Sequence, residues 1–191
     1  MKVSRAQAAE NRDRVVATAG RLFREKGFDG IGLADLMHAA GLTHGGFYRN
    51  FPSKDALAAE ACDRALAAGA ERWRGIIAAA GDAPLQAIVT HYLTAQHRDH
   101  PGAGCALAAL GAEAARRGGP VRGAFTQGLR RLADLVTTML PGRKAARREQ
   151  ALATLSGLVG ALVLARAVDD EALSDEILAA ARRVFGRTPS A

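Results

Sequence analysis

The sequence predicts an all-α protein of nine helices, and three observations support this fold class. Hydrophobic residues make up 49% of the 191 positions, with Ala and Leu the commonest among them. Val, Ile and Thr never form the long alternating run that is typical of a half-buried strand. Apolar residues recur at helical spacing instead, between breaks that Gly and Pro mark.

The first helix is expected over residues 11–26, ending at Gly27, because apolar residues at helical spacing there run beside an arginine-rich side. The apolar stripe consists of Val15, Ala19, Leu22 and Phe23. A short second helix follows, and Gly41 supplies its stop. Its apolar positions follow the i, i+3, i+4, i+7 pattern: Leu33, Leu36, Met37 and Ala40.

A third helix is predicted over 44–50, with Thr43 as its N-cap and Pro52 closing it. Ser53 can cap a fourth helix that runs from Lys54 to about residue 80. Gly-Pro, Pro-Gly and Asp-Asp breaks divide the remainder into five helices. These helices are expected at 82–99, 103–117, 120–140, 143–167 and 170–185.

Two short helices joined at Gly41 are typical of a helix-turn-helix, whose second helix enters the DNA major groove. Gly45 and Gly46 begin that second helix and leave no side chain to hold the backbone away from DNA. The alternative is an ordinary helical hairpin with solvated basic residues. The net charge of +7 and the pI of about 10.2 favour a polyanionic partner without identifying it.

The aromatic residues of the third helix are expected to divide between its two faces. Phe47 and Phe51 are four residues apart and should pack inward, whereas Tyr48 should point outward and can hydrogen-bond a phosphate. Lys54 lies at the start of the fourth helix, where the helix dipole also suits an anion.

Residues 11–57 resemble the N-terminal domain of the TetR family of bacterial transcriptional regulators. The resemblance is carried by A-x-x-L-F-x-x-x-G-F followed by A-G-L-T-x-G-x-F-Y-x-x-F-x-S-K-x-x-L. It implies a helix-turn-helix domain over 1–55 and an effector-binding and dimerisation domain over 56–191. It also implies contacts to double-stranded operator DNA from Thr43, His44, Gly45, Gly46, Tyr48, Arg49 and Lys54.

The chain departs from the family pattern just before the second helix. Ile31 and Gly32 stand where the family usually has Thr or Ser, so the helix cap is expected to be weaker and a hydroxyl contact to phosphate is missing.

The resemblance further implies a homodimer, and the last two expected helices carry apolar stripes and small residues suited to a four-helix interface. Intramolecular core is the alternative explanation for these stripes. The expected interface residues are Leu155, Ser156, Leu158, Val159, Gly160, Leu162, Leu173 and Ile177.

An effector pocket is expected among the helices of the larger domain. Few aromatic residues are available, so the pocket should suit a small apolar or amphipathic molecule. The family resemblance implies that such a molecule releases a repressor from its operator. The candidate lining residues, each also explained as plain core, are Trp73, His91, Tyr92, Cys105, Leu107, Leu110, Phe125 and Leu129.

Cys105 supports an alternative, a regulator that senses electrophiles or oxidants through a thiol. It follows Gly102 and Gly104 at the start of a helix, where the dipole favours the thiolate. The stretch resembles a TetR branch that includes electrophile-responsive regulators. A small buried thiol is the competing interpretation.

Other classes of function find little support in the sequence. His91, His97, His100 and Cys105 do not have a common zinc-site spacing, so we expect no metal and no cofactor. A helical enzyme is the alternative from another class of function, but no nucleophile elbow, phosphate loop or paired His-Glu metal motif occurs in the sequence.

The expected location is cytoplasmic, with no membrane as partner. The N-terminus lacks an apolar signal core. The apolar run at 151–165 is shorter than the roughly 20 residues of a membrane span, so a buried or interface helix is expected there.

Overall fold

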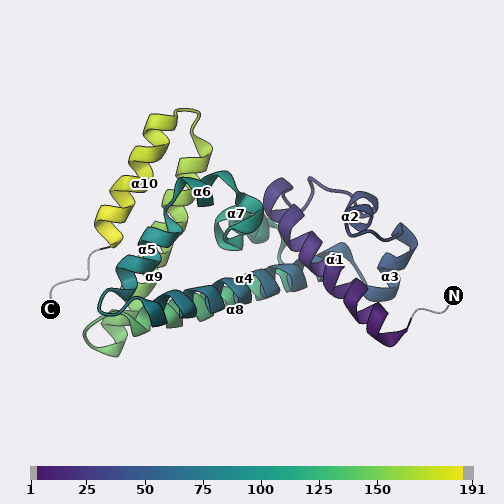
Figure 1. The fold of residues 1–191 in the computed structure, drawn as a ribbon, viewed down its shortest axis with the longest axis horizontal. Helices are drawn as coiled ribbons and strands as arrows, with labels where there is room; N and C mark the ends of the chain where they lie inside the picture. The colour runs from purple at the N-terminus through teal and green to yellow at the C-terminus, as the bar shows by residue number, and fades with distance from the viewer. Residues whose placement is uncertain (1–3, 187–191) are drawn as a thin grey trace. The chain divides into compact units, whose positions relative to one another are not determined.

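The computed structural model describes residues 4–186, and over this range the chain forms ten α-helices, two short 3-10 helices and no strand (Figure 1). The predicted all-α class is therefore confirmed. The helices in chain order are α1 (Arg5–Lys26), α2 (Leu33–Ala39), η1 (His44–Gly46), α3 (Phe47–Asn50), α4 (Lys54–Ala79), α5 (Pro84–Tyr92), α6 (Ala95–Asp99), η2 (Pro101–Ala103), α7 (Ala106–Arg117), α8 (Gly119–Thr138), α9 (Lys144–Ala167) and α10 (Glu171–Phe185).

The helix predicted over 82–99 is two helices in the structure. Leu93 leaves the helical region with φ −93° and ψ 72°, and α5 ends there. Thr94 then begins α6 as an N-cap, because its hydroxyl accepts a 3.0 Å hydrogen bond from the backbone N–H of His97. Neither Gly nor Pro marks this break, so the residue pattern gave no sign of it.

The chain divides into two compact units. One contains the described residues up to Ala65 together with Pro101–Thr126, and the other contains Leu66–His100 and the described residues from Gln127 onward. Helices α4 and α8 contribute residues to both. The segment 101–126, expected in the C-terminal domain from its place in the sequence, thus packs with the N-terminal helices.

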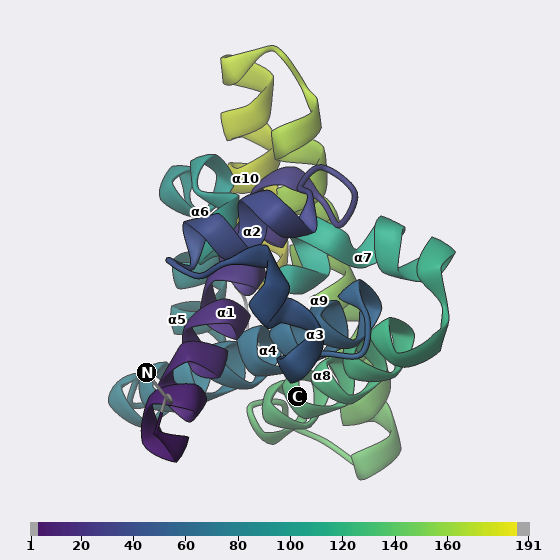
Figure 2. The ribbon, with the colours of Figure 1, turned by 90° about the vertical axis from the view of Figure 1, so that its right-hand side faces the viewer.

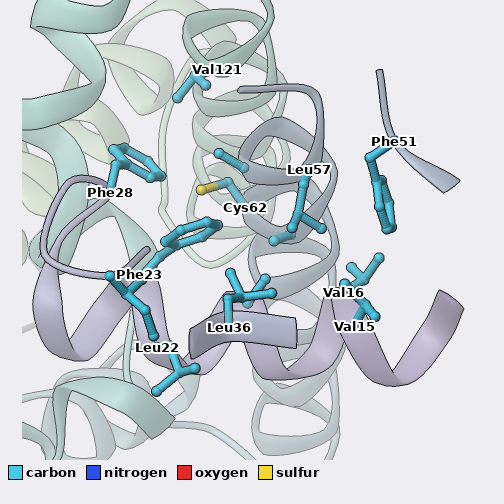
Figure 3. Close-up of a cluster of buried hydrophobic side chains, with 14 of the residues drawn as sticks. Val15, Val16, Leu22, Phe23, Phe28, Leu36, Phe51, Leu57, Cys62 and Val121 are labelled. Carbon is cyan, nitrogen blue, oxygen red and sulfur yellow. The ribbon is translucent and has the colours of Figure 1, made fainter. Parts of the chain in front are cut away.

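The first unit is built on one apolar cluster drawn from α1, α2, α3, α4, α7 and α8. Figure 3 shows its centre, where the rings of Phe23 and Phe28 lie beside the thiol of Cys62. The two rings meet edge to face with centroids 5.4 Å apart. The buried members are Val15, Val16, Ala19, Leu22, Phe23, Phe28, Ile31, Leu36, Met37, Ala40, Phe47, Phe51, Leu57, Ala58, Ala61, Cys62, Leu110, Ala114 and Val121.

The turn after α2 has the hydrogen bonds of a Schellman motif. The N–H of Leu42 donates to the carbonyl of Met37 over 2.9 Å, and that of Gly41 donates to His38 over 2.8 Å. Gly41 has φ +71°, a left-handed conformation that side chains disfavour. The expected role of Gly41 at the helix-turn-helix is confirmed.

The second unit contains an α9–α10 pair that packs closely at both ends. The hydroxyl of Ser174 donates to the carbonyl of Ala165 over 2.7 Å. Toward the other end, the ring of Phe185 covers Gly157, where any Cβ would collide with it. Gly157 therefore serves close packing within the chain rather than between subunits.

Within residues 4–186, α9 is the one helix long and apolar enough to cross a membrane by length and composition. Its buried face contains Leu155, Leu158 and Leu162, each at most 2% exposed within the fold. This buried apolar face is typical of a helix in the core of a folded protein. The sequence predicted a buried or interface helix here.

Candidate nucleic-acid interface

The short helix α3 separates its aromatic residues as predicted. Phe47 is fully buried and Phe51 is 2% exposed, whereas Tyr48 is 66% exposed. In Figure 2, α1, α2 and α3 lie close to one another. The buried rings of Phe47 and Phe51, with centroids 5.7 Å apart, anchor α3 and leave Tyr48 and Arg49 on its open face.

The two glycines before α3 have no structural reason within the described chain. Neither has a positive φ, and a Cβ on Gly45 would meet nothing within 4 Å. A Cβ on Gly46 would only touch the end of Met37 at 3.8 Å. The fold would tolerate larger residues at both positions. Glycine at these positions is therefore better explained by a surface that another molecule approaches closely.

The cap predicted at Thr43 is wrong. Its side chain makes no capping hydrogen bond, and the turn closes through the backbone instead, with Gly46 N–H donating to the Thr43 carbonyl over 3.0 Å. The reason is that His44–Gly46 is a 3-10 turn, which bonds i to i+3 through the backbone. Thr43 and His44 are exposed, and the rings of His44 and Tyr48 lie 6.3 Å apart between centroids.

Lys54 is less available than predicted. The side chain is half-buried, and its Nζ donates to the carbonyl of Ile31 over 2.7 Å. This bond ties the start of α4 to the loop that leads into α2. Ser53 caps α4 as predicted, accepting from the N–H of Ala56 over 3.1 Å. Gly32, as expected, gives α2 no side-chain cap.

The arginine-rich side of α1 serves partly to hold the unit together. Arg12 binds both carboxylate oxygens of Glu60 on α4, at 2.5 and 2.6 Å, and its guanidinium lies 4.8 Å from the centre of the Phe51 ring. Glu60 was not identified from the sequence, because no local signal pairs residues that lie 48 positions apart.

The residues predicted for the dimer interface do not share one surface. Leu155, Leu158 and Leu162 are buried inside the second unit, so assigning them to a partner surface was wrong. They form the stripe with which α9 packs on its own chain. The exposed or half-buried members of the predicted set are Ser156, Val159, Gly160, Leu173 and Ile177.

On their open faces, α9 carries a stripe of three apolar residues and one serine, and α10 carries a stripe of four apolar residues. The positions follow i, i+4, i+7 and i+11 spacing, which places them along one side of a helix. Gly160 lies beside the first stripe, and a Cβ there would meet nothing within 4 Å. The stripes are Leu152, Ser156, Val159 and Val163 on α9, and Leu173, Ile177, Ala180 and Val184 on α10.

The predicted pocket residues are divided between the units. Cys105, Leu107, Leu110 and Phe125 belong to the first, where Leu110 is core and Phe125 packs against it. Trp73, His91, Tyr92 and Leu129 belong to the second. There Trp73 and Tyr92 are buried and meet edge to face with centroids 5.9 Å apart, whereas His91 and Leu129 are exposed.

A groove of about 290 Å³ lies among α6, α9 and α10 in the second unit. None of the predicted pocket residues lines it, and Arg98 and Arg166 give it a charged wall. Arg98 binds Asp175 and Ser174 at 2.8 and 2.9 Å, and Arg166 donates to the carbonyl of Arg98 over 3.0 Å. The groove therefore does not suit the apolar effector expected from the sequence.

The two thiols have different surroundings. Cys62 lies in the core of the first unit, and burial raises the pKa of its thiol to about 12. Cys105 is partly exposed at the N-cap position of α7, where its side chain makes no capping hydrogen bond. Among the described residues, no group of three or more His, Cys, Asp or Glu side chains could hold a metal ion.

Comparison with known proteins agrees with this geometry. Residues 15–61 match the family model described as bacterial regulatory proteins, tetR family. The chain is 28% identical over 134 residues to the HTH-type transcriptional repressor NemR of Escherichia coli, covering 69% of this chain and 67% of NemR. It is 28% identical over 90 residues to the uncharacterized HTH-type regulator YerO of Bacillus subtilis, with 47% of this chain and 31% of YerO covered.

Solved structures share the fold over nearly the whole chain. The reduced form of E. coli NemR superposes with a TM-score of 0.78 at 24% identity, covering 95% of this chain and all of that one. A TetR-family regulator from Cytophaga hutchinsonii gives 0.78 at 21% identity, covering 97% and 96%. The predicted resemblance to the TetR family is confirmed, both in the N-terminal motif and in the fold.

Proposed function

We propose that this chain, a TetR-family transcriptional regulator, is a cytoplasmic homodimeric repressor that binds operator DNA through residues 43–50 and is released by a small molecule. One observation carries the DNA-binding part. Gly45, Tyr48 and Arg49 form an open face around a helix that Phe47 anchors, and no contact among the described residues 4–186 requires that face. A DNA duplex would supply hydrogen-bond acceptors for this face, because phosphates accept hydrogen bonds from tyrosine and arginine.

Arg49→Ala is expected to weaken duplex binding and to lower the salt dependence of the affinity. Loss of one phosphate contact reduces the slope of log K against log salt by about 0.9. Titration at several salt concentrations measures the slope, using a duplex that the wild-type protein enriches from a random-sequence pool. Arg183→Ala on α10 removes the same charge from an exposed site outside the first unit and should leave the slope unchanged. An unaltered slope for Arg49→Ala contradicts the assignment.

The proposed dimer rests on the apolar stripes of α9 and α10. Two such helices from each subunit can bury these stripes in a four-helix interface around a two-fold axis. A dimer would also present two recognition helices to successive half-sites, which compensates for the few contacts that one short helix makes.

The effector is proposed to be small and apolar or amphipathic, on the grounds of composition. Release requires only that the effector favours a non-binding arrangement of the protein, and a coupling of about 1–3 kcal/mol gives roughly five- to 150-fold release.

A thiol trigger is a second candidate, favoured by the exposure of Cys105. An alkylating reagent should modify Cys105 before Cys62 at neutral pH, because Cys62 is buried and its thiol is almost entirely protonated. If Cys105 is the sensor, alkylation lowers duplex binding in the wild type but not in Cys105→Ser. Mass spectrometry after limited alkylation and a parallel gel-shift titration measure both effects. An equal response of the two proteins excludes Cys105 as the trigger.

A further inference from the structure

The loop between α1 and α2 is held by a residue of α7 that lies 85 positions further along the chain. The backbone N–H of Phe28 donates to Oε2 of Glu113 over 2.8 Å. Gly27, with φ +79°, leaves space for this carboxylate, since a Cβ there would lie 2.7 Å from Oε1. A buried backbone donor is thus satisfied by a charged acceptor, which makes a strong hydrogen bond.

Arg117 lies one turn after Glu113 on the same helix and contacts the same loop. Its guanidinium binds Asp29 in the loop and Asp55 in the first turn of α4. It also lies 5.1 Å from the centre of the Phe28 ring. The Arg117 side chain is only 18% exposed, whereas the carboxylates of Asp29 and Asp55 are 85% and 48% exposed, so salt screens both ion pairs from the carboxylate side.

The contacts of Glu113 and Arg117, here called the α7 latch, meet the helix-turn-helix at both of its ends. Phe28 and Asp29 belong to the loop that enters α2, and Asp55 belongs to the helix that follows α3. Lys54 joins the same two ends directly through the carbonyl of Ile31. The orientation of α2 and α3 therefore depends on α7 as well as on their own packing.

We propose that Glu113 and Arg117 are positioning residues for DNA recognition. The proposal rests on the proposed function and adds a prerequisite to it. Neither side chain is assigned a contact to DNA. The α7 latch holds the start of α2 and the start of α4 in one arrangement. The recognition helix therefore loses less conformational entropy when it binds DNA.

Arg117→Ala is expected to weaken binding of the enriched duplex about three- to 30-fold, without changing the salt slope, because no phosphate contact is lost. Arg116→Ala is the matched control, since it removes the same charge from the neighbouring exposed position of α7. It should bind within about twofold of the wild type. Arg117→Lys keeps the charge but lacks the planar guanidinium group that can bind two carboxylates. Its affinity for the duplex should lie between those of Arg117→Ala and the wild type. Titrations are made well below the unfolding midpoint of each variant.

A double-mutant cycle tests whether Arg117 acts through its partner. In an Asp55→Asn background, Arg117→Ala should cost clearly less affinity than it costs in the wild type. Equal affinity of folded Arg117→Ala and wild type, a changed salt slope, or full additivity with Asp55→Asn would each overturn the positioning role. A wild-type protein that enriches no duplex overturns the proposed function itself, which is a distinguishable result.

Discussion

Leu158→Asp is expected to unfold the second unit rather than merely to separate two subunits. Leu158 is fully buried within its own chain, on the face of α9 that also contains Leu155 and Leu162. An unpaired carboxylate at such a site costs several kcal/mol, which is a large share of the roughly 5–15 kcal/mol that stabilises a protein. The thermal unfolding midpoint should fall sharply, and soluble protein should be difficult to recover.

Val163→Asp is the matched variant on the same helix. Val163 is 41% exposed and belongs to the open stripe of α9, so its replacement places a charge in the proposed interface and not in the core. It should yield a folded monomer, whereas the wild type should have the mass of a dimer. Light scattering with circular dichroism distinguishes the two variants. A folded Leu158→Asp monomer, or a Val163→Asp dimer as tight as the wild type, would contradict this account of α9.

Leu158 and Val163 show which feature of α9 could not be predicted from the sequence. Nearly every residue of α9 from 151 to 165 is apolar or small. Helical spacing therefore finds two stripes, and spacing alone cannot say which of them faces the chain's own core. Leu155, Leu158 and Leu162 were assigned to a partner for this reason, although packing against the rest of the unit buries them.

The ends of the helices in the helix-turn-helix were largely predictable because their signals are local, although the expected Thr43 cap is not made. Gly27 and Gly41 end helices where a left-handed residue is required, and Ser53 caps α4 from three positions away. The α7 latch had no such signal. Arg117 and Asp29 are 88 positions apart in the sequence. A basic residue in the last turn of a helix is common and does not by itself predict a partner. Only the three-dimensional arrangement identifies the residues with which it pairs.

Phe47→Ala is expected to remove DNA binding by unfolding the recognition helix, with a loss of about 3–5 kcal/mol in the free energy of unfolding. The ring is fully buried and contacts Phe51 and Tyr48, with centroids 5.7 and 5.1 Å away. Because α3 has only four residues, it cannot be stable without this tertiary contact. Phe47→Leu, which keeps most of the side-chain volume, should recover much of the stability.

Tyr48→Ala separates stability from recognition at the adjacent position. The side chain is 66% exposed, so its removal should change the free energy of unfolding by no more than about 0.5 kcal/mol. If its hydroxyl donates to a phosphate, the affinity for the enriched duplex should fall about two- to tenfold, the cost of one hydrogen bond. Chemical denaturation and duplex titration of both variants give the two quantities independently. Tyr48→Ala with wild-type affinity would remove Tyr48 from the interface, and Phe47→Ala with wild-type stability would show that α3 is held by contacts other than this ring.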